Sequence, residues 1–111
     1  MDTFLRNSGN LTFINCRFNE IYDIENAGTL SMIDCVVSDT AIRNSGKATF
    51  TDCTFENYYT TIENQGDMRI EGCEINHIYE FKSMNGTFEI IDSKVISETG
   101  MRTFMPIGSA Y

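Results

Sequence analysis

Cysteine recurs along this chain at an interval of about 20 residues, and the residues around it recur with it. The members of this column are Cys16, Cys35, Cys53 and Cys73, with Ser93 in the fifth place. The gaps between them are 19, 18, 20 and 20 residues. A unit of this length has too little apolar surface to fold alone, so its copies must stack and bury their apolar faces against one another. The sequence therefore predicts a repeat protein made of about five copies of one supersecondary unit.

A glycine column and several apolar columns share this spacing. The glycines are Gly9, Gly28, Gly46, Gly66 and Gly86. Apolar residues stand two and four positions after each glycine, as Leu11 and Phe13 do in the first copy, and a turn-forming residue then precedes the cysteine position. Apolar residues at alternate positions are typical of strands, because successive side chains of a strand point to opposite faces. Asn, Asp and Gly tolerate the left-handed backbone that a sharp corner between strands needs.

Each copy is thus expected to form three short strands and to make one coil of a parallel β-solenoid. Helical spacing of apolar residues, at i, i+3 and i+4, is absent from the chain. We expect an all-β fold of about five to six coils in one domain that spans residues 1–111. The expected coils cover residues 5–23, 24–41, 42–61, 62–80 and 81–100, with a partial sixth coil at 101–111.

Three segments carry the repeat most fully, namely NSGNLTFINCRF, NAGTLSMIDCVV and NSGKATFTDCTF. Their pattern, Ile-x-Asn-x-Gly-x-Leu-x-Phe-x-Asn/Asp-Cys-x-Phe, resembles the repeats of right-handed parallel β-helices of the pectate-lyase-like superfamily, over residues 5–104. The resemblance implies a right-handed parallel β-helix. That superfamily includes polysaccharide lyases and hydrolases, adhesins, phage tail proteins and non-catalytic solenoids. The resemblance therefore specifies an architecture and leaves the activity open.

A column of charged residues beside the first strand predicts how the coils align. It consists of Arg6, Glu25, Arg43, Glu63, Lys82 and Arg102. In a parallel in-register stack such residues lie about 4.8 Å apart, so opposite charges face each other from Arg6 to Lys82. Each exposed pair contributes only about 0.2–1 kcal/mol. A slip by one coil would place like charges together, so the column favours a single register.

The four cysteines are expected to be buried free thiols. They occupy one inward column, and the sequence has no Cys-x-x-Cys pair of the kind that zinc sites use. Adjacent coils would bring their Cα atoms into bridging range, but parallel side chains keep the Cβ atoms slightly too far apart for a relaxed disulfide. A disulfide and a metal site are the alternatives. We expect no metal and no cofactor, and reduced thiols would fit a cytoplasmic location.

No catalytic set is recognisable in the sequence. His77, the only histidine, stands in a segment that returns from one coil to the next and is expected to be a surface residue. The inward cysteines cannot pair with it as nucleophiles. Where members of the resembled superfamily are enzymes, the resemblance implies acidic clusters or paired carboxylates, and the pair here would be Glu71 and Glu74. Charges of both signs on a solvated strand face are the ordinary alternative, and we expect a non-catalytic protein.

The chain is strongly acidic, with 16 acidic and 8 basic residues and a formal net charge of −8. Direct nucleic-acid binding is disfavoured, because phosphate contacts need a basic patch. An acidic rod could instead compete for the nucleic-acid groove of a partner. No run of about 18 apolar residues predicts a membrane span. The first residues lack the basic and apolar regions of a signal peptide, which also favours a cytoplasmic location.

Tyrosines accompany acidic residues in the segments that return from one coil to the next. We expect these segments to line one edge of the solenoid and to bind a protein partner, because tyrosine is enriched at interfaces. The candidate partner-binding residues are Glu20, Tyr22, Asp23, Asp39, Glu56, Tyr58, Tyr59, Tyr79 and Glu80. The alternative is that these tyrosines only cover a corner of the coil.

A second candidate surface is apolar. Ile14, Ile33 and Val36 are expected to face outward from the first two coils, and Phe104 and Ile107 belong to an apolar C-terminal stretch. Outward apolar side chains on flat strands need cover from another molecule. We therefore expect self-association, most simply a homodimer, through this face or through an open end of the solenoid.

Together these features predict a small, non-catalytic β-helix that acts by presenting a surface. Its most concrete form is an acidic, phage-type inhibitor that binds a nucleic-acid-binding protein. The alternative is a fragment of a larger carbohydrate-binding or carbohydrate-active β-helix, such as an adhesin, a tail-spike or a polysaccharide-lyase-like protein. Capture of a nucleic-acid-binding protein would favour the first interpretation, and glycan binding or release of uronic acid would favour the second.

Overall fold

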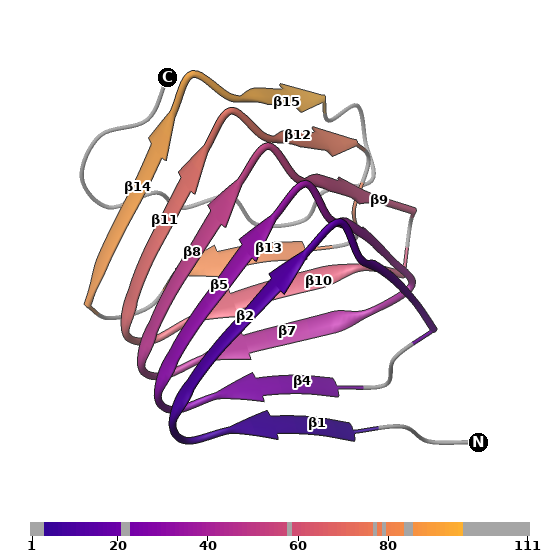
Figure 1. The fold of residues 1–111 in the computed structure, drawn as a ribbon. Helices are drawn as coiled ribbons and strands as arrows, with labels where there is room; N and C mark the ends of the chain where they lie inside the picture. Colours follow the sequence, from indigo (N-terminus) through magenta and orange to yellow (C-terminus); the bar gives the residue numbers. More distant parts are fainter. Residues whose placement is uncertain are drawn as a thin grey trace.

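The computed structural model describes residues 4–20, 23–57, 59–76, 78, 80–83 and 86–96. These residues form fifteen β-strands and no helix. Three strands follow one another in each coil, and equivalent strands of successive coils lie side by side in three parallel sheets (Figure 1). The described part of the chain is therefore a β-solenoid of about five coils.

The three sheets are named in the order in which the chain enters them. Sheet A consists of β1 (Phe4–Asn7), β4 (Asp23–Asn26), β7 (Ala41–Asn44), β10 (Thr61–Asn64) and β13 (Glu80–Ser83). Sheet B consists of β2 (Asn10–Ile14), β5 (Thr29–Ile33), β8 (Lys47–Thr51), β11 (Asp67–Glu71) and β14 (Thr87–Ile91). Sheet C consists of β3 (Arg17–Asn19), β6 (Val36–Ser38), β9 (Thr54–Glu56), β12 (Glu74–Asn76) and β15 (Lys94–Ile96).

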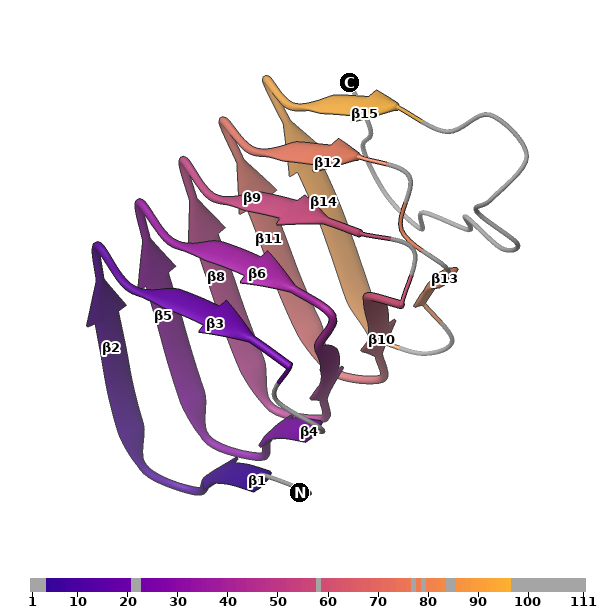
Figure 2. The same cartoon turned by 90° about the vertical axis from the view of Figure 1, so that its right-hand side faces the viewer.

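Each coil is aligned with the next without a shift, and the side view shows the strands of sheet C stepping regularly from coil to coil (Figure 2). In sheet A, Arg6 lies opposite Glu25, Glu25 opposite Arg43, and Glu63 opposite Lys82. This register is the one that the outward charges favour. The prediction of an all-β solenoid with three short strands per coil is confirmed.

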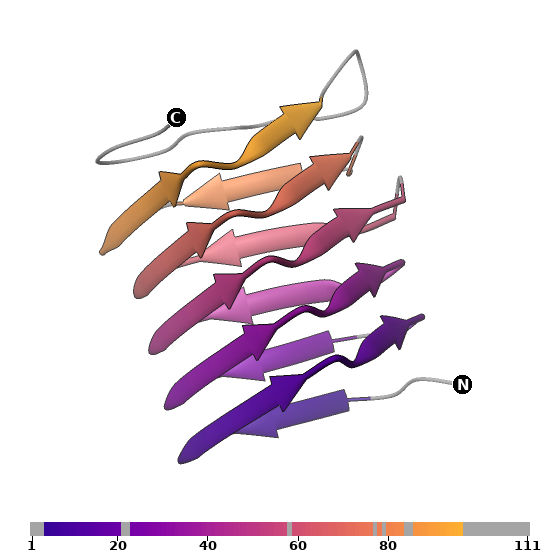
Figure 3. The same cartoon turned by 45° about the horizontal axis from the view of Figure 1, so that its top comes forward.

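The tilted view shows sheet A lying behind the two other sheets, with the interior between them (Figure 3). Burial alternates along the strands, as in β8, where Ala48 and Phe50 are buried and Lys47 is exposed. The ring of Phe50 meets that of Phe55 edge-on, with 5.2 Å between centroids. Because side chains from all coils fill one interior, no coil could bury its apolar face alone. The predicted sixth coil at 101–111 lies outside the described residues.

The corner between sheets A and B needs glycine, because the backbones of successive coils come very close there. A Cβ atom on Gly28 would overlap the carbonyl oxygen of Gly9, and one on Gly46 would overlap that of Gly28. The same overlap with the preceding coil would occur at Gly66 and Gly86. Contact between coils thus explains the glycine column.

A ladder of asparagine side chains runs along the inside of this corner. The Nδ2 group of Asn7 donates to Oδ1 of Asn26, that of Asn26 to Asn44, and that of Asn44 to Asn64, each at 2.8 Å. Asn64 donates in turn to Oγ of Ser83 at 3.3 Å. The ladder satisfies buried amide groups that would otherwise destabilise the fold, and it joins each coil to the next.

Residues with a left-handed backbone make the other two corners. Between sheets B and C they are Asn15, Asp34, Asp52, Gly72 and Asp92, with φ from 50° to 64°. Between sheets C and A they are Glu20, Asp39 and Asn57, with φ from 51° to 86°. Left-handed backbone is unfavourable for most L-residues, and Asn, Asp and Gly tolerate it best. The corner geometry therefore selects short polar residues, several of them acidic.

The cysteine column lies just after the second corner. Cys35, Cys53 and Cys73 are buried, whereas Cys16 is only half-buried because no described coil lies below it. All four are free thiols. The expectation that all four would be fully buried is therefore wrong for Cys16. Burial raises the pKa of the Cys35 thiol, and a hydrogen bond with Cys73 together with burial raises the pKa of Cys53.

Candidate interaction surface

Acidic residues border sheet C on both of its long sides. The first acidic column, at the corner with sheet B, consists of Asp34, Asp52 and Asp92. The second acidic column, at the side of sheet A, consists of Glu20 and Asp39, and Glu56 stands beside it, one register position earlier at the end of β9, where it pairs with Ser38. All members of the first column are exposed, as is Glu20, while Asp39 and Glu56 are half-buried. The first column precedes the strands β6, β9 and β15, and the second column, with Glu56, lies at the ends of β3, β6 and β9. The strands of sheet C lie at the top of Figure 1, where β9, β12 and β15 are labelled.

The short strands of sheet C keep the two columns close together. Each of these strands has three residues. Asp34 and Asp39 stand five residues apart in the second coil, so their Cα atoms are separated by at most about 17 Å at 3.3 Å per residue. Within a column, members of adjacent coils lie about 4.8 Å apart. Sheet C is therefore a narrow strip between two lines of carboxylates.

Among the described residues, no cation lies within 4.0 Å of a carboxylate of either column. The ion pairs within 4.0 Å that the structure describes are Arg6–Glu25, Arg43–Asp23, Arg69–Glu71 and Arg69–Glu89. No member of either acidic column belongs to these pairs. On the outer face of sheet C, cations occur only at the two ends of the described stack, Arg17 in β3 and Lys94 in β15. The middle of the strip is thus negative.

Asp23 does not belong to the exposed edge on which the sequence analysis places it. It begins β4 and is only 3% exposed. Its Oδ2 atom lies 3.6 Å from Nη1 of Arg43, and its Oδ1 atom has no hydrogen-bond partner. Burial, aided by a hydrogen bond with the Glu25 side chain, raises the pKa of Asp23. Its side chain is therefore not accessible to a partner, and this candidate is corrected.

The remaining candidates for partner binding divide into two groups. Tyr59 is 74% exposed, and Glu80 is half-buried at the start of β13. The other three tyrosines of the candidate edge, Tyr22, Tyr58 and Tyr79, lie outside the described residues, as does His77. Within the described part, the edge therefore combines the second acidic column with one exposed aromatic ring.

The first acidic column is not among the candidate surfaces that the sequence predicts. Its members have a turn-forming role, which accounts for their residue type without reference to their charge. The signal was present, because three of the five corner positions are Asp and equivalent positions stack in a solenoid. A residue that a corner needs for its backbone can also present its side chain to solvent.

The apolar candidates for self-association are only partly placed by the structure. Ile14 is 60% exposed on the outer face of β2, whereas Ile33 and Val36 are half-buried. Phe104 and Ile107 lie outside the described residues. The described part thus exposes one large apolar side chain at this face, Ile14, and self-association remains a prediction.

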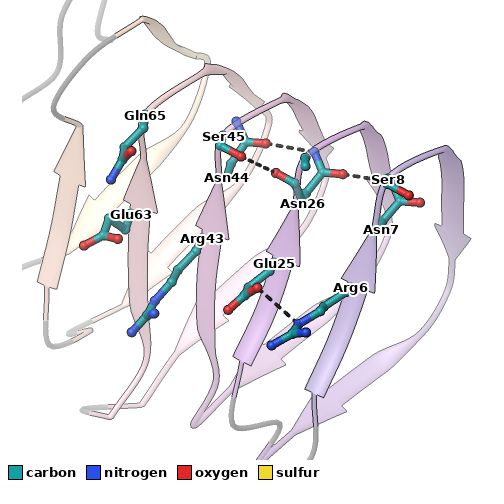
Figure 4. Close-up of a pocket in the computed structure, with 11 residues that line it drawn as sticks. Arg6, Asn7, Ser8, Glu25, Asn26, Arg43, Asn44, Ser45, Glu63 and Gln65 are labelled. Carbon is teal, nitrogen blue, oxygen red and sulfur yellow. Dashed lines mark hydrogen bonds and ion pairs between the residues drawn. The ribbon is translucent and has the colours of Figure 1, made fainter.

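A groove of about 540 Å³ follows the outside of sheet A and its corner with sheet B (Figure 4). Arg6, Glu25, Arg43 and Glu63 line it in sequence from coil to coil. Ser8, Ser45 and Gln65 line it along the corner. Nε of Arg6 lies 3.3 Å from Oε1 of Glu25. Because the charges alternate, the groove offers hydrogen bonds to a polar ligand without selecting for a net charge.

The carboxylate pair considered for catalysis lies across the corner between sheets B and C. Glu71 ends β11 and Glu74 begins β12. Nη2 of Arg69 lies 3.3 Å from Oε1 of Glu71, so one member of the pair already has a cationic partner. Both residues are half-buried on the surface of the rod. Their arrangement is that of charged residues on a solvated strand face.

No group of three or more His, Cys, Asp or Glu side chains in the described part of the chain could hold a metal ion. That part also holds no helix of the length and apolarity needed to cross a membrane.

Comparisons with known proteins return no relative of this chain. No protein-family model, no curated protein and no solved structure matches it. The sheets and their register thus support the β-solenoid, while membership of the pectate-lyase-like superfamily stays an expectation.

Proposed function

We propose that this protein is a non-catalytic interaction protein that binds the basic, nucleic-acid-binding face of a protein partner and blocks it. The observation that carries this proposal is the pair of acidic columns along sheet C. Carboxylates without nearby cations create a negative potential that attracts a basic surface. The stacked coils hold these carboxylates in fixed positions, so little order is lost when a partner binds.

The spacing of the columns supports competition with a nucleic acid. One strand of a duplex carries one charge per about 3.4 Å of helix axis, and a fully occupied column would carry one per about 4.8 Å. The Cα atoms of the two columns are at most about 17 Å apart, which is of the same order as the width of the DNA major groove, about 12 Å. A protein surface that binds two lines of phosphates could therefore engage both columns.

Two triple variants test the proposal, each removing three negative charges with little change in shape. The first is Asp34→Asn, Asp52→Asn and Asp92→Asn. The second is Glu20→Gln, Asp39→Asn and Glu56→Gln. A matched control, Glu63→Gln, Asp67→Asn and Glu89→Gln, removes three charges from sheets A and B. Asn and Gln keep the length of each side chain, and Asn also tolerates the left-handed corner.

The measurement is capture of a protein from a lysate, its identification, and a titration in the presence of duplex DNA and of increasing salt. We expect a nucleic-acid-binding protein whose capture is competed by DNA and weakened by salt. Both column variants should weaken capture by about tenfold or more, and the control should not. The proposal is contradicted if DNA does not compete with the capture, or if all three variants reduce the capture equally.

The groove over sheet A favours a second candidate, a carbohydrate-binding or carbohydrate-active role as part of a larger β-helix. Its guanidinium, carboxylate, amide and hydroxyl groups can all bond to sugar hydroxyls. A glycan array and an assay for uronic acid released from pectin or alginate test this candidate. The carbohydrate role would be supported over binding of a basic protein partner if Arg43→Ala abolished glycan binding and the column variants left it unchanged.

A further inference from the structure

The cysteine column brings thiols of successive coils next to one another inside the solenoid. Cys35, Cys53 and Cys73 are buried, and the main-chain N–H of Cys53 donates to Sγ of Cys73 at 3.3 Å. The acidic columns and the groove over sheet A lie on the outside of the same coils. The buried thiols therefore take no part in the surfaces proposed for binding.

Hydrogen bonds show that the three buried sulfurs occupy equivalent positions in their coils. Each lies 3.3–3.4 Å from the carbonyl oxygen two residues before it in the chain. Each also lies 3.3–3.5 Å from a carbonyl oxygen of the coil below, which belongs to Phe13, Met32 or Phe50. Because the coils stack in register, equivalent atoms of adjacent coils are about 4.8 Å apart. Adjacent sulfurs are therefore separated by about one coil spacing.

Ser93 shows that the same place in a coil also accepts a hydroxyl group. Its Oγ atom donates to the carbonyl oxygen of Ile91 at 2.9 Å and accepts from the main-chain N–H of Cys73 at 3.0 Å. Sγ of Cys73 makes the same two contacts, with Glu71 and with Cys53. Substitution of a column cysteine by serine thus removes the sulfur and keeps the hydrogen bonds.

Two thiols in line, one coil apart, are suited to a soft cation that takes two ligands. A metal–thiolate bond is about 2.3 Å long, so a cation midway between two sulfurs holds them about 4.6 Å apart. This distance is close to the coil spacing of about 4.8 Å. Zinc instead takes four ligands, and no group of three or more His, Cys, Asp or Glu among the described residues could hold a metal. The geometry therefore favours a linear site over a tetrahedral one.

Burial favours a divalent cation at such a site. Cys53 and Cys73 belong to the same apolar core as Phe50 and Ile75, and an apolar interior penalises net charge. Two thiolates carry two negative charges, which a divalent cation neutralises and a monovalent cation does not. The mercuric ion is the soft divalent cation that binds two thiolates in a line.

Within the column, Cys73 is the thiol that its surroundings prepare to lose a proton. Hydrogen bonds from the thiol and from the main-chain N–H of Cys53 favour the thiolate of Cys73 and lower its pKa, although burial opposes this. Burial instead raises the pKa of Cys35. An incoming cation thus meets the most readily formed thiolate at Cys73, with the sulfur of Cys53 one coil below.

We propose that Cys53 and Cys73 form a binding site for one mercuric ion, which lies in line between their two sulfurs. Both S–H bonds break and two S–Hg bonds form, the two protons pass to solvent, and nothing is oxidised or reduced. The neutral complex joins the third coil to the fourth inside the apolar core. The site is separate from the acidic columns, so this proposal and the proposed function can fail independently.

Two double variants with the same composition test the site. The adjacent-thiol variant, Cys16→Ser with Cys35→Ser, keeps Cys53 and Cys73, which are one coil apart. The separated-thiol variant, Cys16→Ser with Cys53→Ser, keeps Cys35 and Cys73, which are two coils or about 9.6 Å apart. One linear cation can join the sulfurs of the first variant and cannot join those of the second.

The measurement is equilibrium dialysis against mercuric chloride buffered with a monothiol. The ion is added to the folded chain and, separately, during refolding from urea, so that slow entry into the core does not hide binding. We expect the adjacent-thiol variant to bind one ion per chain, at least about a hundredfold more tightly than the separated-thiol variant. Binding should raise its melting temperature, because the ion binds the folded state.

X-ray absorption of the mercury-loaded wild-type chain tests the geometry without any substitution. It should show two sulfur neighbours at about 2.3 Å. Three or more sulfur neighbours would overturn the proposal, as would equal affinity of the two variants or no binding by the adjacent-thiol variant after refolding. Zinc chloride is the control ion, and a stabilisation by zinc equal to that by mercury would contradict the linear site.

Discussion

At the scale of single residues, the glycines at the first corner show how closely the coils approach. The carbonyl of each described coil occupies the place where the next glycine would carry a Cβ atom. A substitution there cannot be accommodated by moving a flexible side chain, because the obstacle is backbone. The same residue type at the end of the stack meets no such obstacle.

Replacing Gly46 and Gly9 by alanine gives a matched pair. Gly46→Ala should lower the free energy of unfolding by about 3 kcal/mol or more, because the added methyl group overlaps backbone of the coil below. Gly9→Ala should change it by less than about 0.5 kcal/mol. Urea denaturation followed by circular dichroism measures both. Equal effects of the two substitutions would contradict the close stacking at this corner.

Asp23 leads to a prediction about pH. Its pKa is raised mainly by burial, so the folded protein favours the protonated carboxyl more than the unfolded chain does. As the pH rises from the ordinary pKa of Asp to the raised pKa of Asp23, the carboxyl ionises more readily in the unfolded chain than in the folded protein. The free energy of unfolding therefore falls over this pH range. Arg43 and Arg6 oppose this effect, and Glu25 adds to it.

Asp23→Asn should consequently be more stable than the wild type at pH 7. The difference should shrink as the pH falls through the raised pKa toward the ordinary value, because the wild-type carboxyl then becomes neutral in both states. Urea titrations at several pH values between about 4 and 7 measure the difference. A variant that is less stable at pH 7, and increasingly so as pH rises, would show that the ion pair with Arg43 outweighs burial.

At the scale of strands and corners, the columns of the sequence predict the register because every coil repeats the same contacts. Residues such as Leu11 and Leu30 align because each has the same place relative to its glycine. The ion pair of Asp23 with Arg43 could not be predicted in this way, since it joins residues of two different columns in neighbouring coils. The exposure of Cys16 also escaped prediction, because it follows from the place of its coil in the stack.

The charged ladder of sheet A shows a similar limit. Its register is as predicted, yet Arg43 pairs with Asp23 rather than with Glu25, its direct neighbour across the strands. Glu25 is instead held by Arg6. A long side chain such as Arg43 can reach a diagonal partner on the neighbouring strand. The alternation of charge signs alone therefore does not predict which of two nearby carboxylates forms the ion pair.

The thiol column predicts a graded chemical reactivity. Cys16 is half-buried in the first coil, whereas the three later cysteines are buried. All four thiols donate a hydrogen bond to a main-chain carbonyl group. A disulfide reagent such as DTNB should therefore modify one thiol of the native protein and all four after unfolding. Cys16→Ser should remove the native reaction. Rapid modification of several thiols in the folded protein would contradict the buried column.

At the scale of the whole molecule, stacking converts a weak feature of each coil into a continuous surface. A single Asp at a corner is unremarkable, but equivalent corners placed about 4.8 Å apart make an acidic column. Two such columns, on either side of strands three residues long, give sheet C its negative face. The proposed binding of a basic partner therefore depends on the in-register stack.

Distances between spin labels test that stack most directly. In a Cys16→Ser background, labels replace Thr12 and Glu89, which lie in one outward column of sheet B and are four coils apart. An in-register stack predicts about 19 Å between the two Cβ atoms, and about 14 Å when the second label moves from Glu89 to Arg69, three coils away. A broad distribution of label–label distances would contradict the in-register stack. So would a distance that does not shorten when the second label moves from Glu89 to Arg69.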